Sequence, residues 1–195
     1  MFEFNDSNRN GAYCPENGFT LIELMVTIAV AAVLIAIAVP SFRTLTVSNA
    51  LTTAANDMVG ALNLTRMEAI KLNATTQFCG NTTATNGTDT LGAACGSNSG
   101  SVVMLQTGST AAIQVRAAAM GIQNQVQLAS AGITAVRFGG EGLGYLASTA
   151  GTSTAPYSGN VADICSTQIS SGNHRVISIA TGSIITVTST TGSCP

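Results

Sequence analysis

The stretch GFTLIELMVTIAVAAVLIAIAVP, residues 18–40, decides the fold of this 195-residue chain. From Leu24 to Val39 it carries no charged residue, and Thr27 is its one polar side chain. As a helix, residues 19–39 would reach about 31 Å, roughly the thickness of one hydrocarbon core. A helix that is apolar on every face does not suit the surface of a soluble domain. The stretch therefore predicts a membrane-spanning helix.

A secretory signal peptide is the main alternative for this stretch. Such a peptide would have a basic n-region, a shorter apolar core and a cleavage site after that core. Here the preceding residues are net acidic, with Glu3, Asp6 and Glu16 against Arg9. The best cleavage candidate, Gly18, comes before the apolar run. The pattern therefore favours a helix that stays in the protein.

Glu23 is the exception in the apolar run. A carboxylate at the end of a membrane span is costly and needs a partner, although the dipole of a helix N-terminus favours it. The nearest cation that the chain offers is the free amine that would form at Phe19 if the chain were cut after Gly18. We therefore expect Glu23 to find its partner within or between subunits.

Gly18–Leu24, followed by the apolar run and Pro40, resembles the class III signal of type IV prepilins and type II secretion pseudopilins. The resemblance implies that a prepilin peptidase cuts after Gly18 and methylates Phe19. It also implies that Glu23 pairs with the N-terminal amine of a neighbouring subunit during assembly, and that Pro40 bends the helix.

One feature departs from that family. Its leaders usually carry Lys or Arg, whereas residues 1–18 here are net acidic. The positive-inside rule places basic residues on the cytoplasmic side of a span. Arg43 instead follows the span on the side that is expected to lie outside.

A second helical pattern follows Pro40, whose missing N–H is expected to kink or break the first helix. An apolar stripe steps by three and four residues through Leu51, Ala55, Met58, Leu62, Thr65, Ala69 and Leu72. This spacing predicts an amphipathic helix that packs on a sheet. Glu68 and Lys71 form an i,i+3 pair on its other side, and we expect Asn73 to end it.

The remainder predicts short strands separated by turns rich in Gly, Ser and Thr. The expected strands are Ser101–Leu105, Ile113–Ala117, Gln125–Leu128, Ile133–Phe138, Arg175–Ile179 and Ile184–Thr188. Thr149–Asn160 is expected to be a loop. Gly139–Gly144 looks like a phosphate-binding loop only superficially and is expected to be a turn between strands.

The chain has five cysteines, Cys14, Cys79, Cys95, Cys165 and Cys194. Removal of residues 1–18 would leave an even number beyond a membrane-directing segment, which favours disulfides. Of the three possible connectivities, the most local one, Cys79–Cys95 with Cys165–Cys194, is our hypothesis. The sequence has no C-x-x-C and only His174 as histidine, so neither a metal nor another cofactor is expected.

The C-terminal part narrows the resemblance. Residues 133–142 (ITAVRFGGEG), Cys165, residues 175–182 (RVISIATG) and Cys194 resemble the GspH/FimT family. That family holds a type II secretion pseudopilin and the minor pilins FimT and FimU. The resemblance covers essentially the whole chain after the leader.

The family resemblance implies an α+β fold, with a long N-terminal membrane and assembly helix followed by a β-rich globular pilin head. Its parts would be 1–18, a cleaved class III leader; 19–40, the transmembrane and filament-core helix; 41–73, the amphipathic helix packing on the head; and 74–195, the soluble head with two disulfides. The subunit would cross the inner membrane once, with its head in the periplasm, before joining a filament at the cell surface.

An enzyme and a nucleic-acid binder are both disfavoured. His174 is expected to be a solvated surface histidine, and no catalytic residue is assigned. Some FimT-type pilins bind DNA through Gly-Arg-x-Arg, but residues 182–185 here read GSII. Loss of both arginines should weaken binding to phosphates, which leaves only His174 and Arg175 as DNA-binding candidates.

We therefore expect a FimU-type minor pilin at or near the tip of a type IV pilus, supporting pilus assembly and twitching motility. Its partners would be the prepilin peptidase, other minor and major pilins, and the inner membrane. The paired C-terminal cysteines favour this over the first alternative, a GspH-like pseudopilin supporting protein export, because such pseudopilins often lack them. The second alternative is a FimT-like pilin that binds DNA for uptake.

Overall fold

A computed structural model describes residues 18–96, 98–118, 125–149 and 155–195. Nearly all of the predicted leader, including Cys14, lies outside the described residues. The chain divides into two compact units, Met1–Ser41 and Phe42–Pro195.

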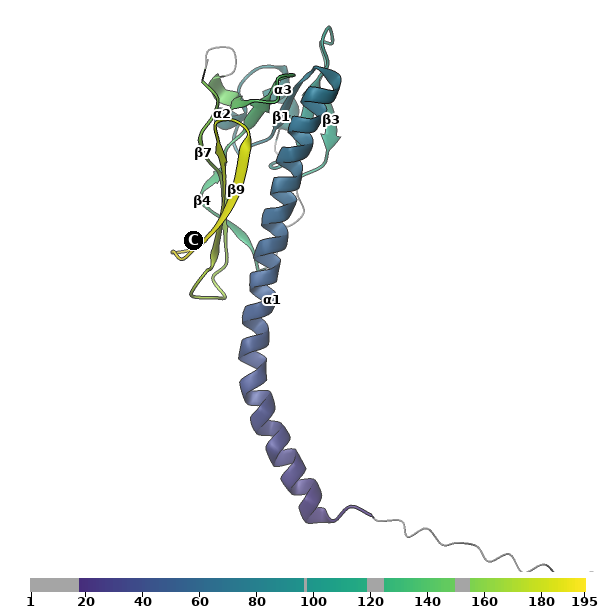
Figure 1. Cartoon of the computed structure of the whole chain (residues 1–195), viewed down its shortest axis with the longest axis vertical. Helices are drawn as coiled ribbons and strands as arrows, with labels where there is room; N and C mark the ends of the chain where they lie inside the picture. Colours follow the sequence, from purple (N-terminus) through teal and green to yellow (C-terminus); the bar gives the residue numbers. More distant parts are fainter. Residues whose placement is uncertain (1–17, 97, 119–124, 150–154) are drawn as a thin grey trace, which may run out of the picture. The chain divides into compact units, whose positions relative to one another are not determined.

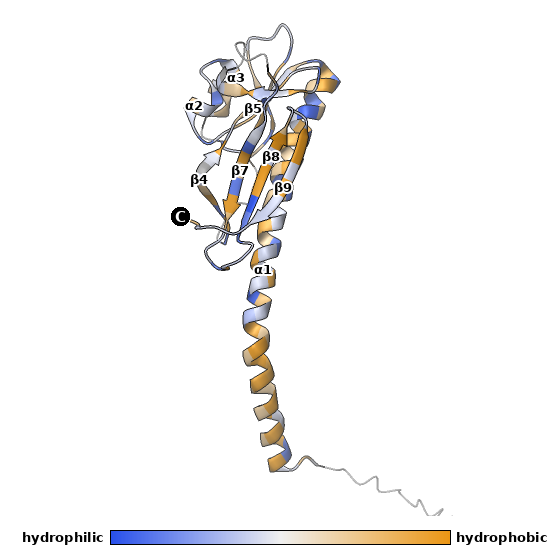
Figure 2. Ribbon diagram, turned by 60° about the vertical axis from the view of Figure 1, so that its left-hand side comes forward, coloured by the Kyte–Doolittle hydropathy of each residue, from blue (hydrophilic) through white to orange (hydrophobic). Residues whose placement is uncertain are grey.

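Helix α1 (Leu21–Leu72) begins in the first unit and continues into the second. Within the described residues it is the one helix long and apolar enough to cross a membrane, and its most apolar window has a mean hydropathy of 2.7 with no part buried. Figure 2 shows that its apolar residues gather in the N-terminal half, while polar ones increase toward the C-terminal end. The helix is not broken at Pro40. One proline removes a single backbone hydrogen bond, which a long helix with intact turns on both sides tolerates.

The second half of α1 packs one face into the head (Figure 1). The buried residues are Val47, Leu51, Ala54, Ala55, Met58, Ala61, Leu62, Thr65 and Ala69. They include all of the predicted stripe except Leu72, which is 42% exposed because it stands in the last turn. The predicted Glu68–Lys71 pair is present at 3.7 Å. Asn73 follows the helix with a φ of 45°, as expected of a residue that ends it.

The head contains two antiparallel sheets. The first has the strand order β3-β2-β1-β5-β6 and the second the order β4-β7-β8-β9. The strands are β1 (Thr75–Phe78), β2 (Val102–Leu105), β3 (Ile113–Arg116), β4 (Gln127–Ile133), β5 (Val136–Phe138), β6 (Gly144–Leu146), β7 (Gly159–Cys165), β8 (His174–Ala180) and β9 (Ile184–Thr190). The short helices α2 (Thr83–Asn86) and α3 (Thr90–Cys95) lie between β1 and β2, and the 3₁₀ turn η1 (Ala147–Thr149) follows β6.

One hydrophobic core joins α1 to both sheets. Leu51, Met58 and Leu62 of α1 lie in it with Phe78 and Phe138 of the first sheet. The second sheet adds Ile164 of β7 and Ile177 and Ile179 of β8 to the same core. The aliphatic face of the helix thus contributes to the same core as both sheets.

The predicted strand Ile133–Phe138 is wrong as a single element. Ile133 ends β4 in the second sheet, whereas Val136 begins β5 in the first. Between them, the Thr134 N–H donates to the Val161 carbonyl at 2.7 Å and the Ala135 carbonyl accepts from the Ala147 N–H at 3.2 Å. The chain therefore changes sheets within two residues, although its alternation looks continuous.

Candidate functional site

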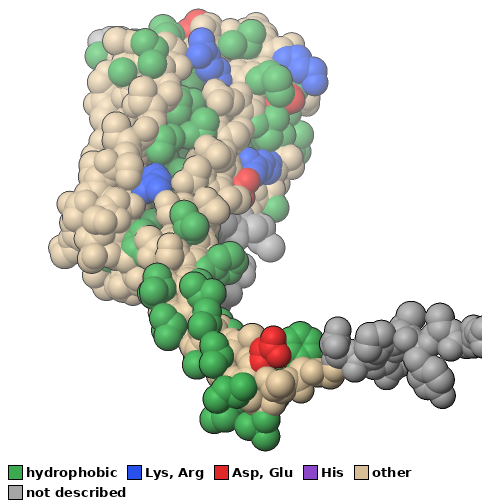
Figure 3. Space-filling view, turned by 60° about the horizontal axis from the view of Figure 1, so that its bottom comes forward, with side chains coloured by type: hydrophobic (Ala, Val, Ile, Leu, Met, Phe, Trp, Pro, Cys, Tyr) green, Lys and Arg blue, Asp and Glu red, His purple; other side chains and the backbone are tan. Residues whose placement is uncertain are grey.

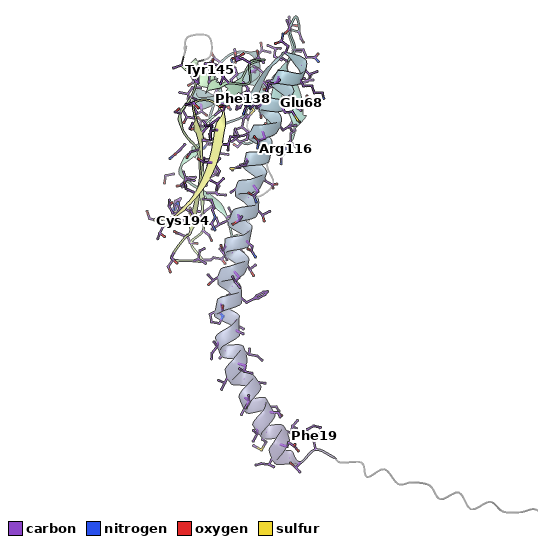
Figure 4. The ribbon with its side chains drawn as sticks, in the orientation of Figure 1. Phe19, Glu68, Arg116, Phe138, Tyr145 and Cys194 are labelled. Atoms are coloured by element: carbon purple, nitrogen blue, oxygen red, sulfur yellow. A yellow bond between two sulfur atoms is a disulfide. The ribbon has the colours of Figure 1, made fainter. Side chains whose placement is uncertain are left out.

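The segment before α1 is exposed and lies outside the helix. Phe19 is 81% exposed (Figure 4), and a Cβ placed on Gly18 would meet nothing within 4 Å. The helix begins only at Leu21. The Gly18–Phe19 peptide bond is therefore open to an enzyme that needs extended backbone.

Thr20 caps the N-terminus of α1. Its hydroxyl accepts from the Glu23 N–H at 3.3 Å and lies 3.5 Å from the Glu23 carboxylate, to which it can donate. Its carbonyl accepts the first helical hydrogen bond, from the Leu24 N–H at 3.2 Å. The order Thr-x-x-Glu is that of a capping box, a sequence pattern that was not among the features predicted above.

The cap gives Glu23 a neutral partner but no counter-charge. No cation lies within ion-pair distance of its carboxylate in the described part of the chain. The cap holds the carboxylate over the first turn, where the helix dipole favours a negative charge. The negative charge thus stays available to a cation from elsewhere.

Both predicted cysteine pairs are bonded in the structure. Cys79 joins Cys95 with a Cα–Cα distance of 5.5 Å, and Cys165 joins Cys194 at 5.8 Å. The first closes the segment that holds α2 and α3. The second fixes the C-terminal tail to the end of β7, and Figure 4 shows Cys194 beside the second sheet.

A buried arginine ties the first disulfide loop to the sheet. Arg137 of β5 donates two hydrogen bonds to the Asp89 carboxylate, at 2.7 and 2.9 Å, and two more, from Nε and Nη2, to Gln77 Oε1 of β1. Asp89 also caps α3 by accepting from the Gly92 N–H at 3.1 Å. Hydrogen bonding to Arg137 lowers the pKa of Asp89, against a smaller opposing effect of burial. This network was not predicted from the sequence, because Gln77, Asp89 and Arg137 lie far apart along the chain.

His174 is buried and not solvated, so the expectation for it was wrong. It is 5% exposed, and its Nδ1 lies 3.0 Å from both carboxylate oxygens of Asp163. The tail covers it, since Asn173 forms two hydrogen bonds with the backbone of Gly192, at 2.9 and 3.1 Å. A side chain held in this way is not presented to DNA or to a substrate.

Arg175 is also engaged within the head. Its Nη1 donates to the Gly172 carbonyl at 2.7 Å and to Ser189 Oγ at 2.9 Å, and its Nη2 donates to Ser48 Oγ of α1 at 3.1 Å. The guanidinium therefore serves to join β8, β9 and the helix. It would have to release these contacts before it could bind a phosphate.

Gly182, which matches the glycine of the DNA-binding motif, has a structural role in the turn at residues 181–182. Thr181 and Gly182 have φ values of 48° and 71°, and the Ser183 N–H donates to the Ala180 carbonyl at 3.1 Å. Positive φ at both central residues is typical of a type I′ turn, and Ala180 pairs with Ile184 across the hairpin. The two motif arginines would stand at Ser183 and Ile185, on either side of Ile184, which is 58% exposed.

The comparisons with known proteins agree with this architecture. Residues 54–183 match the family described as type II transport protein GspH. The chain belongs to the GspH family. Residues 15–39 match the prokaryotic N-terminal methylation motif. Searches of the curated proteins and of the solved structures returned no match.

Membership of the GspH family makes the chain a pilin-like or pseudopilin-like minor subunit of the GspH/FimT group. The methylation motif implies processing by a prepilin peptidase and assembly with other pilins or pseudopilins. The two matches cover different parts of the molecule. The methylation motif covers the apolar segment, and the GspH family covers much of the packed half of α1 with most of the head. The GspH family is a structural one, and in the described residues no three His, Cys, Asp or Glu side chains gather to hold a metal.

Proposed function

We propose that this subunit is a minor pilin of a type IV pilus, incorporated at or near the filament tip, where it supports pilus assembly and twitching motility. The observation that carries the proposal is the Cys165–Cys194 disulfide, which fixes the C-terminal tail over His174. Cross-links of this kind suit a head that works outside the cell. We further propose that the chain spans the inner membrane once, with its head in the periplasm, before it enters the filament.

The parts of the chain have separate roles in this proposal. Residues 1–18 are a leader that is removed, and 19–40 anchor the subunit and later lie in the filament core. Residues 41–73 hold the head 74–195 to that anchor. Glu23, kept in place by Thr20, pairs with the methylated amine at Phe19 of a neighbouring subunit.

The Glu23 proposal predicts that E23Q lowers the incorporation of this subunit into filaments at least tenfold. The amide keeps the shape of the side chain but removes the charge that attracts the amine. The matched control is D57N, which removes an exposed carboxylate from the other half of the same helix. Immunoblots of sheared filaments and of membranes measure both variants. Normal incorporation of E23Q would contradict the pairing.

A pseudopilin of type II secretion is the second candidate, because the matching family is described as a type II transport protein. A deletion strain distinguishes the two. The pilus proposal predicts fewer surface pili and less twitching with normal exoprotein secretion, all restored by the gene in trans. Normal pili with failed secretion would favour the pseudopilin.

DNA capture is not proposed, because Arg175 is engaged within the head and residues 183–185 lack the motif arginines. A gel-shift assay with the mature protein should show at most weak, non-specific DNA binding.

A further inference from the structure

Arg43 differs from the other cations in the described part of the chain. Arg66, Lys71, Arg116, Arg137 and Arg175 each contact an acceptor within the protein. Arg116, for example, reaches back from β3 to the Asp57 carbonyl at 3.1 Å (Figure 4). Arg43 is exposed and contacts no acceptor among the described residues. Its charge is therefore available to a ligand.

The Arg43 side chain lines a pocket of about 550 Å³ in the second unit. The pocket is formed by Phe42, Arg43, Thr46 and Val47 of α1, by Gln125, which precedes β4, and by Gln168, which follows β7. We call these six residues the basal pocket. On the face shown in Figure 3, the Lys and Arg side chains lie apart from one another on a surface that is mostly uncharged. A single arginine with nearby amides can therefore dominate the local potential.

The two glutamines add hydrogen-bonding capacity to the basal pocket. Neither the Gln125 nor the Gln168 side-chain amide has a hydrogen-bond partner in the described part of the chain. Both amides can donate to an oxygen anion beside a guanidinium. The floor of the pocket is Val47, which is only 2% exposed. The basal pocket thus offers one positive charge and two sets of amide donors above an apolar floor.

The position of Arg43 along α1 identifies the kind of anion. The charge-free run between Glu23 and Arg43 extends about 28 Å as a helix, close to the thickness of a hydrocarbon core. Arg43 therefore falls where the headgroups begin. Phe42 and Leu45, 72% and 60% exposed, stand beside it as apolar groups suited to the acyl boundary.

We propose that the basal pocket binds the phosphate of an anionic phospholipid while the subunit is in the membrane. This inference rests on the proposed membrane residence of the chain, but it holds for a pilin and for a pseudopilin alike. Arg43 supplies the charge, Gln125 and Gln168 donate to the phosphate oxygens, and Phe42 contacts the upper acyl chains. Such a contact explains why Arg43 stands at the outer end of the span, although the positive-inside rule predicts basic residues on the cytoplasmic side.

The test uses the mature full-length chain in detergent, with phosphatidylglycerol and phosphatidylcholine of identical acyl chains added together. Native mass spectrometry should show about fivefold more bound phosphatidylglycerol, the effect of one cation at an anionic headgroup. R43Q should abolish this preference, whereas K71Q should keep it. The double variant Q125A/Q168A should reduce it with Arg43 in place. Because these side chains are solvent-facing, all variants should keep the circular dichroism of the parent.

Three results would overturn the proposal. One is equal retention of the two lipids by the parent chain. Another is an unchanged preference for phosphatidylglycerol in R43Q or in Q125A/Q168A. That result would mean that the lipid binds elsewhere, or that Arg43 contacts a protein partner. The third is displacement of the lipid by equimolar inorganic phosphate, which would make a free anion the ligand. None of these results would alter the deletion phenotypes, so the proposed function is tested separately.

Discussion

Position 182 requires glycine for two reasons, its backbone conformation and the close approach of neighbouring atoms. Its φ of 71° is a conformation that side chains disfavour, and a Cβ there would lie 2.8 Å from the Gly144 carbonyl oxygen and from Pro156. Its own N–H and carbonyl bind the backbones of Tyr157 and Gly144, both at 2.8 Å. The hairpin between β8 and β9 is thereby fastened to β6.

We predict that G182A lowers the free energy of unfolding by about 3 kcal/mol or more, the sum of backbone strain and overlap. G108A is the matched control. Gly108 has a φ of 83°, but a Cβ there meets nothing within 4 Å. Only strain of about 1 kcal/mol should remain. Thermal unfolding of the mature chain in detergent measures both, and equal losses would contradict the role of the close contacts.

The Asp89–Arg137 pair predicts a dependence of stability on pH. Because Arg137 lowers the pKa of Asp89 in the folded state, the pair stabilises the fold above the unfolded pKa of about 3.9. This contribution is lost as the pH falls through the lowered folded pKa. The Asp89 side chain is 53% exposed, so the contribution should stay below about 1 kcal/mol.

D89N should therefore be less stable than the parent at pH 7 and nearly equal to it at pH 2. D57N serves as the control, since its Arg116 partner is 4.0 Å away. Unfolding midpoints across this pH range provide the measurement. A constant difference between D89N and the parent at every pH would contradict the account.

At the scale of elements, the second half of α1 has a buried and an exposed face. Met58 is 1% exposed within the core, whereas Met67 is 54% exposed on the other side of the same helix. M58A should lower the free energy of unfolding by about 2–5 kcal/mol, because it leaves a cavity. M67A should change it by less than about 0.5 kcal/mol. Thermal unfolding measures both variants. Similar losses of stability in M58A and M67A would contradict the assignment of Met58 to the buried face of the helix and Met67 to the exposed one.

The helix and the strands β8 and β9 of the second sheet were predictable because their residues repeat with a clear period. Strands β8 and β9 extend the predicted Arg175–Ile179 and Ile184–Thr188 by one residue or more. Strand β7 was missed and its first residues assigned to a loop, because Gly159, Asn160 and Asp163 have low strand propensity. It is nonetheless internal to its sheet, where pairing on both sides outweighs propensity.

The strands β1 and β6 were also missed. Strand β1 has four residues, directly after α1, and β6 has three. Segments of this length carry too little periodicity to be recognised. Their pairing with β5 depends on the change of sheet after Ile133, which no local pattern encodes.

At the scale of the whole molecule, the chain combines an apolar helical segment with a cross-linked head. The sequence was enough to predict both of these parts, because the processing motif is contiguous and the cysteines pair locally. It did not predict the burial of His174 or the basal pocket. Those features depend on the C-terminal tail, on α1 and on the ends of β4 and β7, which only the folded chain brings together.

The central claim is that this GspH-family chain is cut after Gly18 and assembled from its new N-terminus. The most direct test is the intact mass of the protein purified from the membranes of its own cells. We predict a chain that begins at Phe19, carries one added methyl group and contains two disulfides. Cells without the prepilin peptidase should yield the uncut, unmethylated chain. A protein that keeps residues before Phe19 in cells with an active peptidase would contradict the account.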